Sequence, residues 1–94
     1  MRLTPAQLDI IRSTVAEQFG SNAHVWLFGS RADDSKRGGD VDLYIETNHP
    51  ALPIELRCKS QLQEKLDLHV DLVIQQPGND TPISQIAKNT GVSL

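Results

Sequence analysis

The sequence predicts an α/β (α+β) fold: a small mixed sheet of about three to four strands covered by helices. Two observations support this fold class. Apolar residues recur at helical spacing in the longer segments, and three short segments rich in strand formers lie between them. The chain has 94 residues, a length that suits one domain and not two. We therefore expect residues 1–94 to form a single domain.

Three helices are expected. The first begins at Thr4, which can cap it, with Pro5 at the first helical position and Gln7 completing a capping box. The apolar spacing that follows is typical of a helix with one buried face. Two further helices are predicted over residues 53–66 and 82–89.

Three strands are expected at residues 24–28, 40–45 and 69–74, because these runs are short, apolar or alternating, and bounded by turn residues. A polar connection over residues 30–39 joins the first two strands, with a short helical turn after Ser30. The order helix, strand, loop, strand, helix, strand, helix indicates a small sheet with its helices on one side.

Composition limits the classes of function. The formal net charge of −3 argues against a general nucleic-acid binder, which would normally carry a basic face. Cys58 is the one cysteine, so the chain can form no internal disulfide, as suits a reducing compartment. We find neither a signal-peptide pattern nor a run of membrane-spanning length, and we expect a cytoplasmic protein.

Three aspartates carry the candidate chemistry. Asp40 and Asp42 lie two apart in a predicted strand and therefore share a face. Asp71 interrupts a run otherwise suited to a buried strand, and it joins them if the two strands pair. Carboxylates that repel one another favour a divalent cation, and Mg²⁺ prefers oxygen ligands. Three carboxylates suit two metal ions about 3.5–4 Å apart, the arrangement used for phosphoryl displacement.

A glycine-rich polar loop precedes these aspartates. Gly29 allows the backbone to approach a phosphate, and Ser30 can donate its hydroxyl to one. Arg31, Lys36 and Arg37 are close enough in sequence to meet phosphate or partner carboxylates, and the sequence leaves both readings open.

Gly29-Ser30, nine intervening residues and then Asp40-Val41-Asp42, with Asp71 in a later strand, resembles the signature of the nucleotidyltransferase superfamily. The small size resembles the minimal nucleotidyltransferase family in particular. This resemblance implies that Gly29, Ser30 and Arg31 bind the nucleotide. It also implies that Asp40, Asp42 and Asp71 are the metal ligands and catalytic residues, with Asp71 helping to deprotonate the attacking hydroxyl.

The same resemblance implies a function and a partner. Many proteins similar to this one are antitoxins that transfer AMP from ATP to a tyrosine of a HEPN ribonuclease toxin. We therefore expect a hetero-oligomer with such a toxin, ATP as substrate and two Mg²⁺ ions. Asp33 and Asp34 depart from the Arg-Gly that often follows Gly-Ser-Arg-Ala in the family.

Other interpretations remain open at this point. The protein could inhibit its partner by covering it, without catalysis, or it could modify a small molecule or RNA ends. Each aspartate taken singly could be a solvent-facing residue. The histidines, which do not cluster in the sequence, are expected to be structural or exposed, and Tyr44 is expected to pack. The three histidines are His24, His49 and His69.

Overall fold

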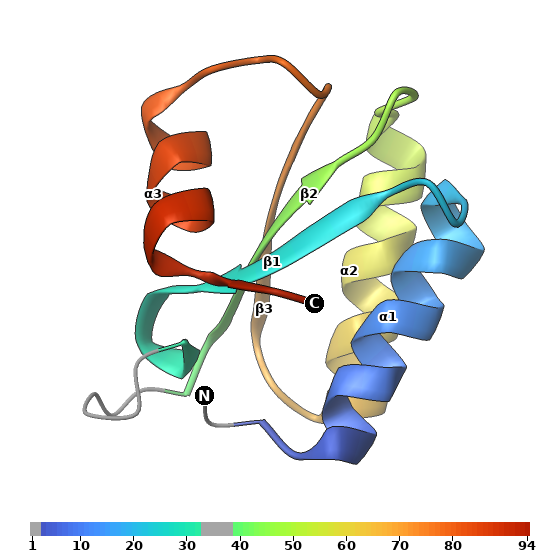
Figure 1. Ribbon diagram of the computed structural model, residues 1–94. Helices are drawn as coiled ribbons and strands as arrows, with labels where there is room; N and C mark the ends of the chain where they lie inside the picture. Colours follow the sequence, from blue (N-terminus) through green and yellow to red (C-terminus); the bar gives the residue numbers. More distant parts are fainter. Residues whose placement is uncertain (1–2, 33–38) are drawn as a thin grey trace.

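The computed structural model describes residues 3–32 and 39–94, which form three layers with a sheet in the middle (Figure 1). Helices α1 and α2 cover one face of the sheet, and α3 covers the other. In chain order the elements are α1 (Pro5–Phe19), β1 (His24–Phe28), the 3₁₀ turn η1 (Gly29–Arg31), β2 (Val41–Glu46), α2 (Leu52–Leu66), β3 (Val70–Gln75), α3 (Pro82–Thr90) and β4 (Val92–Ser93).

The sheet is mixed, as predicted, with the strand order β3-β2-β1-β4. Strand β1 runs antiparallel to both β2 and β4, and β2 runs parallel to β3. Helix α2 makes the crossover that a parallel pair requires. The register sets Asp42 beside Asp71 and opposite Phe28. Residues at paired positions point to the same face, so this register decides which side chains meet.

The predicted starts of α1 and α3 are confirmed, whereas α2 begins one residue earlier than predicted, at Leu52. Thr4 Oγ1 accepts from the Gln7 amide at 3.1 Å, and the Gln7 side chain accepts from the Thr4 amide at 2.9 Å. Thr81 and Ser84 form the same reciprocal cap on α3. None of the helices in the described part of the chain has the length and apolar character needed to cross a membrane.

The main core lies between the sheet and the pair α1 and α2. Alternate residues of β2 point into it, and the strand period therefore determines that the intervening aspartates point away. Cys58 is fully buried there, as expected for a small core residue. The buried core residues are Ile11, Val15, Val25, Leu27, Val41, Leu43, Ile45, Cys58, Leu62, Leu66 and Val70.

The prediction that the helices lie on one side of the sheet was wrong. Helix α3 packs on the face opposite to α1 and α2, where Lys88 pairs with Glu46 Oε2 at 2.6 Å. The Lys88 ammonium also lies 5.3 Å from the centroid of the Trp26 ring. Tyr44 is fully buried beneath this helix, which confirms that it packs. Polar and aromatic contacts hold α3 in place, and a pattern of apolar residues does not reveal them.

The C-terminal strand β4 is also absent from the sequence-based prediction. It has two residues, Val92 and Ser93, which pair with Leu27 and Trp26 of β1. A two-residue strand is too short for its alternation to be recognised. Gly91 precedes it at a position where an added Cβ would overlap with the backbone oxygens of Ala87 and Leu27. The chain therefore needs glycine here to pass from α3 into the sheet.

Candidate active site

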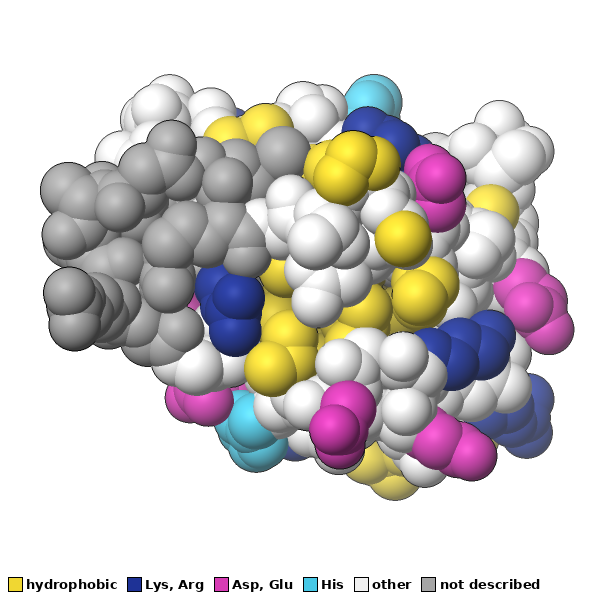
Figure 2. Space-filling view, turned by 90° about the horizontal axis from the view of Figure 1, so that it is seen from below, with side chains coloured by type: hydrophobic (Ala, Val, Ile, Leu, Met, Phe, Trp, Pro, Cys, Tyr) yellow, Lys and Arg dark blue, Asp and Glu magenta, His cyan; other side chains and the backbone are white. Residues whose placement is uncertain are grey.

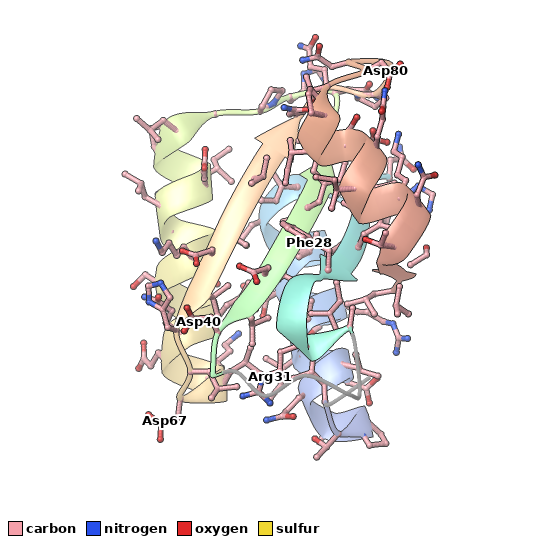
Figure 3. All side chains as sticks on the ribbon, turned by 90° about the vertical axis from the view of Figure 1, so that its left-hand side faces the viewer. Phe28, Arg31, Asp40, Asp67 and Asp80 are labelled. Atoms are coloured by element: carbon pink, nitrogen blue, oxygen red, sulfur yellow. The ribbon has the colours of Figure 1, made fainter. Side chains whose placement is uncertain are left out.

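The three predicted aspartates lie at one end of the sheet, and two of them, Asp40 and Asp71, belong to a compact group of possible metal ligands that does not include Asp42. Asp40 directly precedes β2, Asp42 is its second residue, and Asp71 is the second residue of the parallel neighbour β3. Asp42 and Asp71 are register partners, so their side chains leave the same face of the sheet. Figure 3 shows Asp40 at the end of the molecule opposite to Asp80. Strand alternation and parallel pairing together produce this convergence.

The electrostatics of Asp42 fit a site for a cation. Burial raises the pKa of the Asp42 carboxyl above its ordinary value, and the charges of Asp71 and Asp40 raise that pKa further. His69 acts in the opposite direction. A divalent cation would relieve both the desolvation cost and the mutual repulsion of the carboxylates. The donor set therefore suits Mg²⁺, which takes oxygen ligands.

Gly29 lies against one of these carboxylates. Its φ is +72°, and a Cβ built on it would overlap with Oδ2 of Asp42. Only glycine adopts this positive φ at low cost and also leaves the space that the Asp42 carboxylate occupies. The sequence predicted a close approach at Gly29, and the structure places the Asp42 carboxylate there. An approach of phosphate to the same backbone stays a prediction.

The loop after β1 brings Arg31 back towards Asp40. The predicted helical turn forms, but it spans Gly29–Arg31 and therefore includes Ser30 instead of following it. The Arg31 guanidinium donates from Nη2 to the carbonyl of Gly39 at 3.2 Å, beside Asp40. Arg31 and Asp40 lie near the same end of the sheet in Figure 3. A role in nucleotide binding stays a prediction for Gly29, Ser30 and Arg31.

Several predicted residues cannot be placed against this site. Lys36 and Arg37, assigned to phosphate or partner carboxylates, lie outside the described residues, as do Asp33 and Asp34. In the view of Figure 2, acidic, basic and histidine side chains surround a strip of hydrophobic ones. The described part of this surface therefore mixes both signs of charge.

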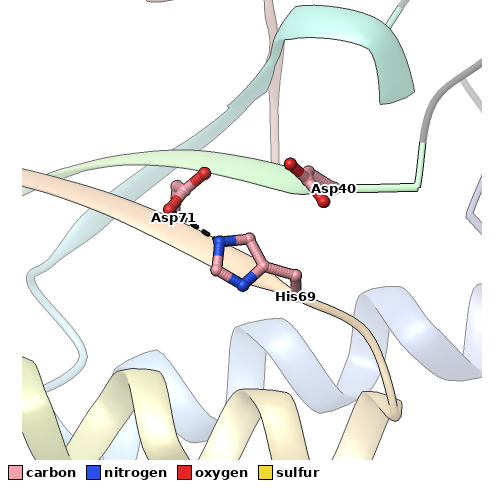
Figure 4. Close-up of side chains that lie close together, drawn as sticks. All are labelled: Asp40, His69 and Asp71. Carbon is pink, nitrogen blue, oxygen red and sulfur yellow. Dashed lines mark hydrogen bonds and ion pairs between the residues drawn. The ribbon is translucent and has the colours of Figure 1, made fainter.

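His69, which was expected to be structural or exposed, is exposed and lies beside the acidic site, a position that the sequence analysis did not predict. Its Nε2 lies 3.1 Å from Oδ1 of Asp71, and its side chain points toward the same place as Asp40 and Asp71 (Figure 4). One ligand atom from each of these three residues lies within 4.8 Å of the others. Lys59 of α2 also approaches Asp71 Oδ1, at 4.0 Å. The missed signal was local: His69 stands two residues before Asp71, the spacing of a shared strand face.

A separate hollow lies at the other end of the sheet. It has a volume of about 280 Å³ and is lined by residues of the turn after α1 and of the turn after β2, among them Asn22 and His49. The aspartates begin β2, whereas this hollow adjoins its end. The hollow is therefore not part of the acidic site, which is an open surface: half of the Asp71 side chain is exposed.

With this geometry established, comparison with known proteins identifies the family. The family model described as "Nucleotidyltransferase domain" matches residues 8–93, which include all five of the predicted motif positions. The chain belongs to the nucleotidyltransferase domain family, and the mixed fold agrees with that membership. Among curated proteins, no match to the chain is found.

Proposed function

We propose that this protein is a Mg²⁺-dependent nucleotidyltransferase acting as an antitoxin. It transfers AMP from ATP to a tyrosine hydroxyl of a HEPN ribonuclease toxin and thereby silences the toxin. One observation carries the chemical part of this proposal. In a chain of the nucleotidyltransferase family, Asp40, Asp42 and Asp71 lie at the start of two neighbouring parallel strands, close enough for the charges of Asp40 and Asp71 to raise the pKa of Asp42.

Each residue of the site would have a distinct role in the transfer. Asp40, Asp42 and Asp71 hold Mg²⁺, which, when bound, neutralises phosphate charge and acidifies the attacking hydroxyl. Gly29 leaves room for the Asp42 carboxylate, and the turn that it begins, Gly29–Arg31, would bind the phosphates of the nucleotide. Asp71, held by His69, accepts the proton of the acceptor hydroxyl.

The transfer is an in-line displacement at the α-phosphorus of ATP. The acceptor oxygen forms a bond to the α-phosphorus of ATP. The bond from that phosphorus to the pyrophosphate oxygen breaks, and pyrophosphate leaves with the bonding electrons. The hydroxyl proton moves to the Asp71 carboxylate and then to solvent.

The openness of the site supports a macromolecular acceptor. Asp40 is exposed, and the Asp71 side chain is 50% exposed, so a hydroxyl carried on another protein can reach both carboxylates. A tyrosine on a partner surface satisfies that requirement. The identity of the partner as a HEPN toxin rests on the resemblance of the motifs to the minimal nucleotidyltransferases.

A steric antitoxin is the competing function. Two leucines one turn apart on α2 favour a binding surface, because Leu52 is 64% exposed and Leu56 is 57% exposed. A protein that only covered its partner would not need the three aspartates. The two functions therefore differ in what Asp42→Asn does.

The test is a labelling experiment with a matched control. Purified protein is incubated with α-labelled ATP, Mg²⁺ and a lysate of its own host, alongside Asp42→Asn and Asp80→Asn. Asp80 is an exposed aspartate at the far end of the sheet (Figure 3), and its substitution is the same chemical change. We expect one labelled protein band with wild type and Asp80→Asn and none with Asp42→Asn.

Each other outcome has a defined meaning. Label in nucleic acid or in a small molecule would retain the chemistry and reject the protein acceptor. Wild-type labelling by Asp42→Asn would reject the catalytic assignment. Absence of label, together with protection of cells by Asp42→Asn, would establish the steric function.

A further inference from the structure

His69 extends the acidic site in a way that the three aspartates do not explain. The carboxylates offer oxygen atoms, and His69 adds an imidazole nitrogen at the same place. This inference rests on the proposed metal site and concerns which metal ion that site prefers.

The distances suit shared coordination. Two ligand atoms that bind one octahedral ion at about 2.1 Å, at right angles, lie about 3 Å apart. His69 Nε2 and Asp71 Oδ1 are 3.1 Å apart, and an oxygen of Asp40 completes a group within 4.8 Å. An ion could replace the shared hydrogen bond without a large movement of either side chain.

The positions of these side chains also leave room for an ion. The side chains of His69 and Asp71 are 54% and 50% exposed, and Asp40 is exposed as well. They leave two adjacent strand starts, and Val41, which lies between Asp40 and Asp42, donates its amide to the His69 carbonyl at 2.9 Å. That backbone hydrogen bond fixes the separation of the two strands where the ligands begin.

We propose that His69 is a metal ligand together with Asp40 and Asp71, and that this position prefers a first-row transition dication such as Mn²⁺ to Mg²⁺. Imidazole nitrogen strengthens binding of transition metals, whereas Mg²⁺ favours oxygen ligands and retains its water. An Asp₂His set therefore shifts the selectivity of a site that three aspartates alone would leave to Mg²⁺. Lys59, the other neighbour of Asp71, is a hydrogen-bond donor without an acceptor and is therefore not a metal ligand here.

A metal titration without nucleotide tests the proposal. Free Mn²⁺ is counted by electron paramagnetic resonance, and Mg²⁺ is titrated as a competitor, at one fixed pH. We expect His69→Ala to weaken Mn²⁺ binding about tenfold or more while Mg²⁺ binding changes about twofold or less. His49→Ala, an exposed histidine beside the remote hollow, should bind both ions as wild type does.

A second variant separates ligation from simple pairing. His69→Gln keeps an N–H that can donate to Asp71 but has no imidazole nitrogen. If His69 only holds Asp71 in place, Gln should preserve the wild-type preference between the two ions. If His69 is a ligand, Gln should lose the preference for Mn²⁺. The imidazole NMR signals of His69 in wild type should broaden on addition of Mn²⁺ wherever the ion binds beside Asp71, so they report that the ion occupies this place.

Three results would overturn the proposal. They are an equal loss of affinity for both ions in His69→Ala, unchanged Mn²⁺ affinity in that variant, or imidazole NMR signals of His69 that do not broaden when Mn²⁺ is added. Thermal unfolding in chelator shows that each variant is folded before it is titrated. Because no nucleotide is present, failure of the labelling experiment and failure of this titration are separate results.

Discussion

At the scale of the residue, Gly29 and Asp42 depend on one another. An alanine at position 29 would bring its Cβ against Asp42 Oδ2, the far end of a side chain that can rotate away. The fold would survive that movement, but the carboxylate would leave the site. Gly20 provides a control, since its φ is +95° and an added Cβ would meet nothing within 4 Å.

We therefore predict that Gly29→Ala and Gly20→Ala each lose about 1–3 kcal/mol of stability, because both positions have a positive φ that alanine rarely adopts. Gly29→Ala alone should lose metal binding and labelling. The measurements are urea unfolding and Mg²⁺ titration of the two variants. Normal metal binding by Gly29→Ala would show that metal binding does not require the Asp42 carboxylate in its present position.

The raised pKa of Asp42 predicts a pH dependence of stability. A folded pKa above the unfolded value of 3.8 means that this residue favours the folded state most below that value. Its contribution is then lost as pH rises through the folded pKa. In chelator, Asp42→Asn should remove this decrease in stability with rising pH. The effect on the free energy of unfolding is about 0.5 kcal/mol or less, because the residue is partly exposed.

Urea unfolding of wild type and Asp42→Asn from pH 3.5 to 7 measures the difference. As the pH rises above the ordinary aspartate pKa, the free energy of unfolding of wild type should fall below that of Asp42→Asn. The variant should therefore be the more stable protein at neutral pH. A wild type that gains stability relative to Asp42→Asn over this range would mean that hydrogen bonds to the carboxylate outweigh its repulsion.

At the scale of the element, α3 depends on a polar network on the sheet. The Tyr44 hydroxyl lies 3.2 Å from Glu46 Oε2 and 3.1 Å from Gln75 Oε1, and Thr81 Oγ1 donates to the same Gln75 oxygen at 2.9 Å. Thr81 is the N-cap of α3. The network therefore joins the start of the helix to β2 and β3.

Tyr44→Phe should destabilise the fold by about 1–2 kcal/mol, because it removes a buried donor from two acceptors. Hydrogen exchange of the α3 amides should accelerate, while exchange in α1 follows only the global change. Equal acceleration in α1 and α3 would show that the network does not act locally on α3.

An element can be predicted from the sequence where its position depends on neighbouring residues, and not where it depends on contacts between residues far apart in the chain. The convergence of Asp40, Asp42 and Asp71 follows from strand alternation, which is visible in the sequence, and from the parallel pairing of β2 with β3, which the sequence analysis could only assume. The side of the sheet that α3 covers depends on contacts such as that of Lys88 with Glu46, 42 residues apart in the numbering. No local pattern encodes such a contact.

His69 is exposed, as the sequence analysis allowed, but its place beside Asp71 was not predicted, for a different reason. The sequence analysis compared the histidines with one another, whereas the informative comparison was with Asp71, two residues on. Spacing along a strand could have revealed the pair. The approach to Asp40 could not have been read in this way, because it requires the register of β2 against β3.

At the scale of the whole molecule, the core and the site occupy different regions. The main core lies between the sheet and the pair α1 and α2, whereas the aspartates leave the other face at one end. Loss of metal should therefore abolish transfer without unfolding the chain. In chelator, we expect the circular dichroism spectrum and the cooperative unfolding transition to persist.

Restoring Mg²⁺ should then stabilise the fold by mass action. At ten times the dissociation constant the gain is about 1.4 kcal/mol, which corresponds to a rise in Tm of about 6–11 °C for a chain of this size. Asp71→Asn should show little of this rise, while Asp80→Asn should show all of it. If the chain unfolds in chelator, the metal ion is needed for folding. The conclusion that the core and the site lie on different faces of the sheet and are independent would then be wrong.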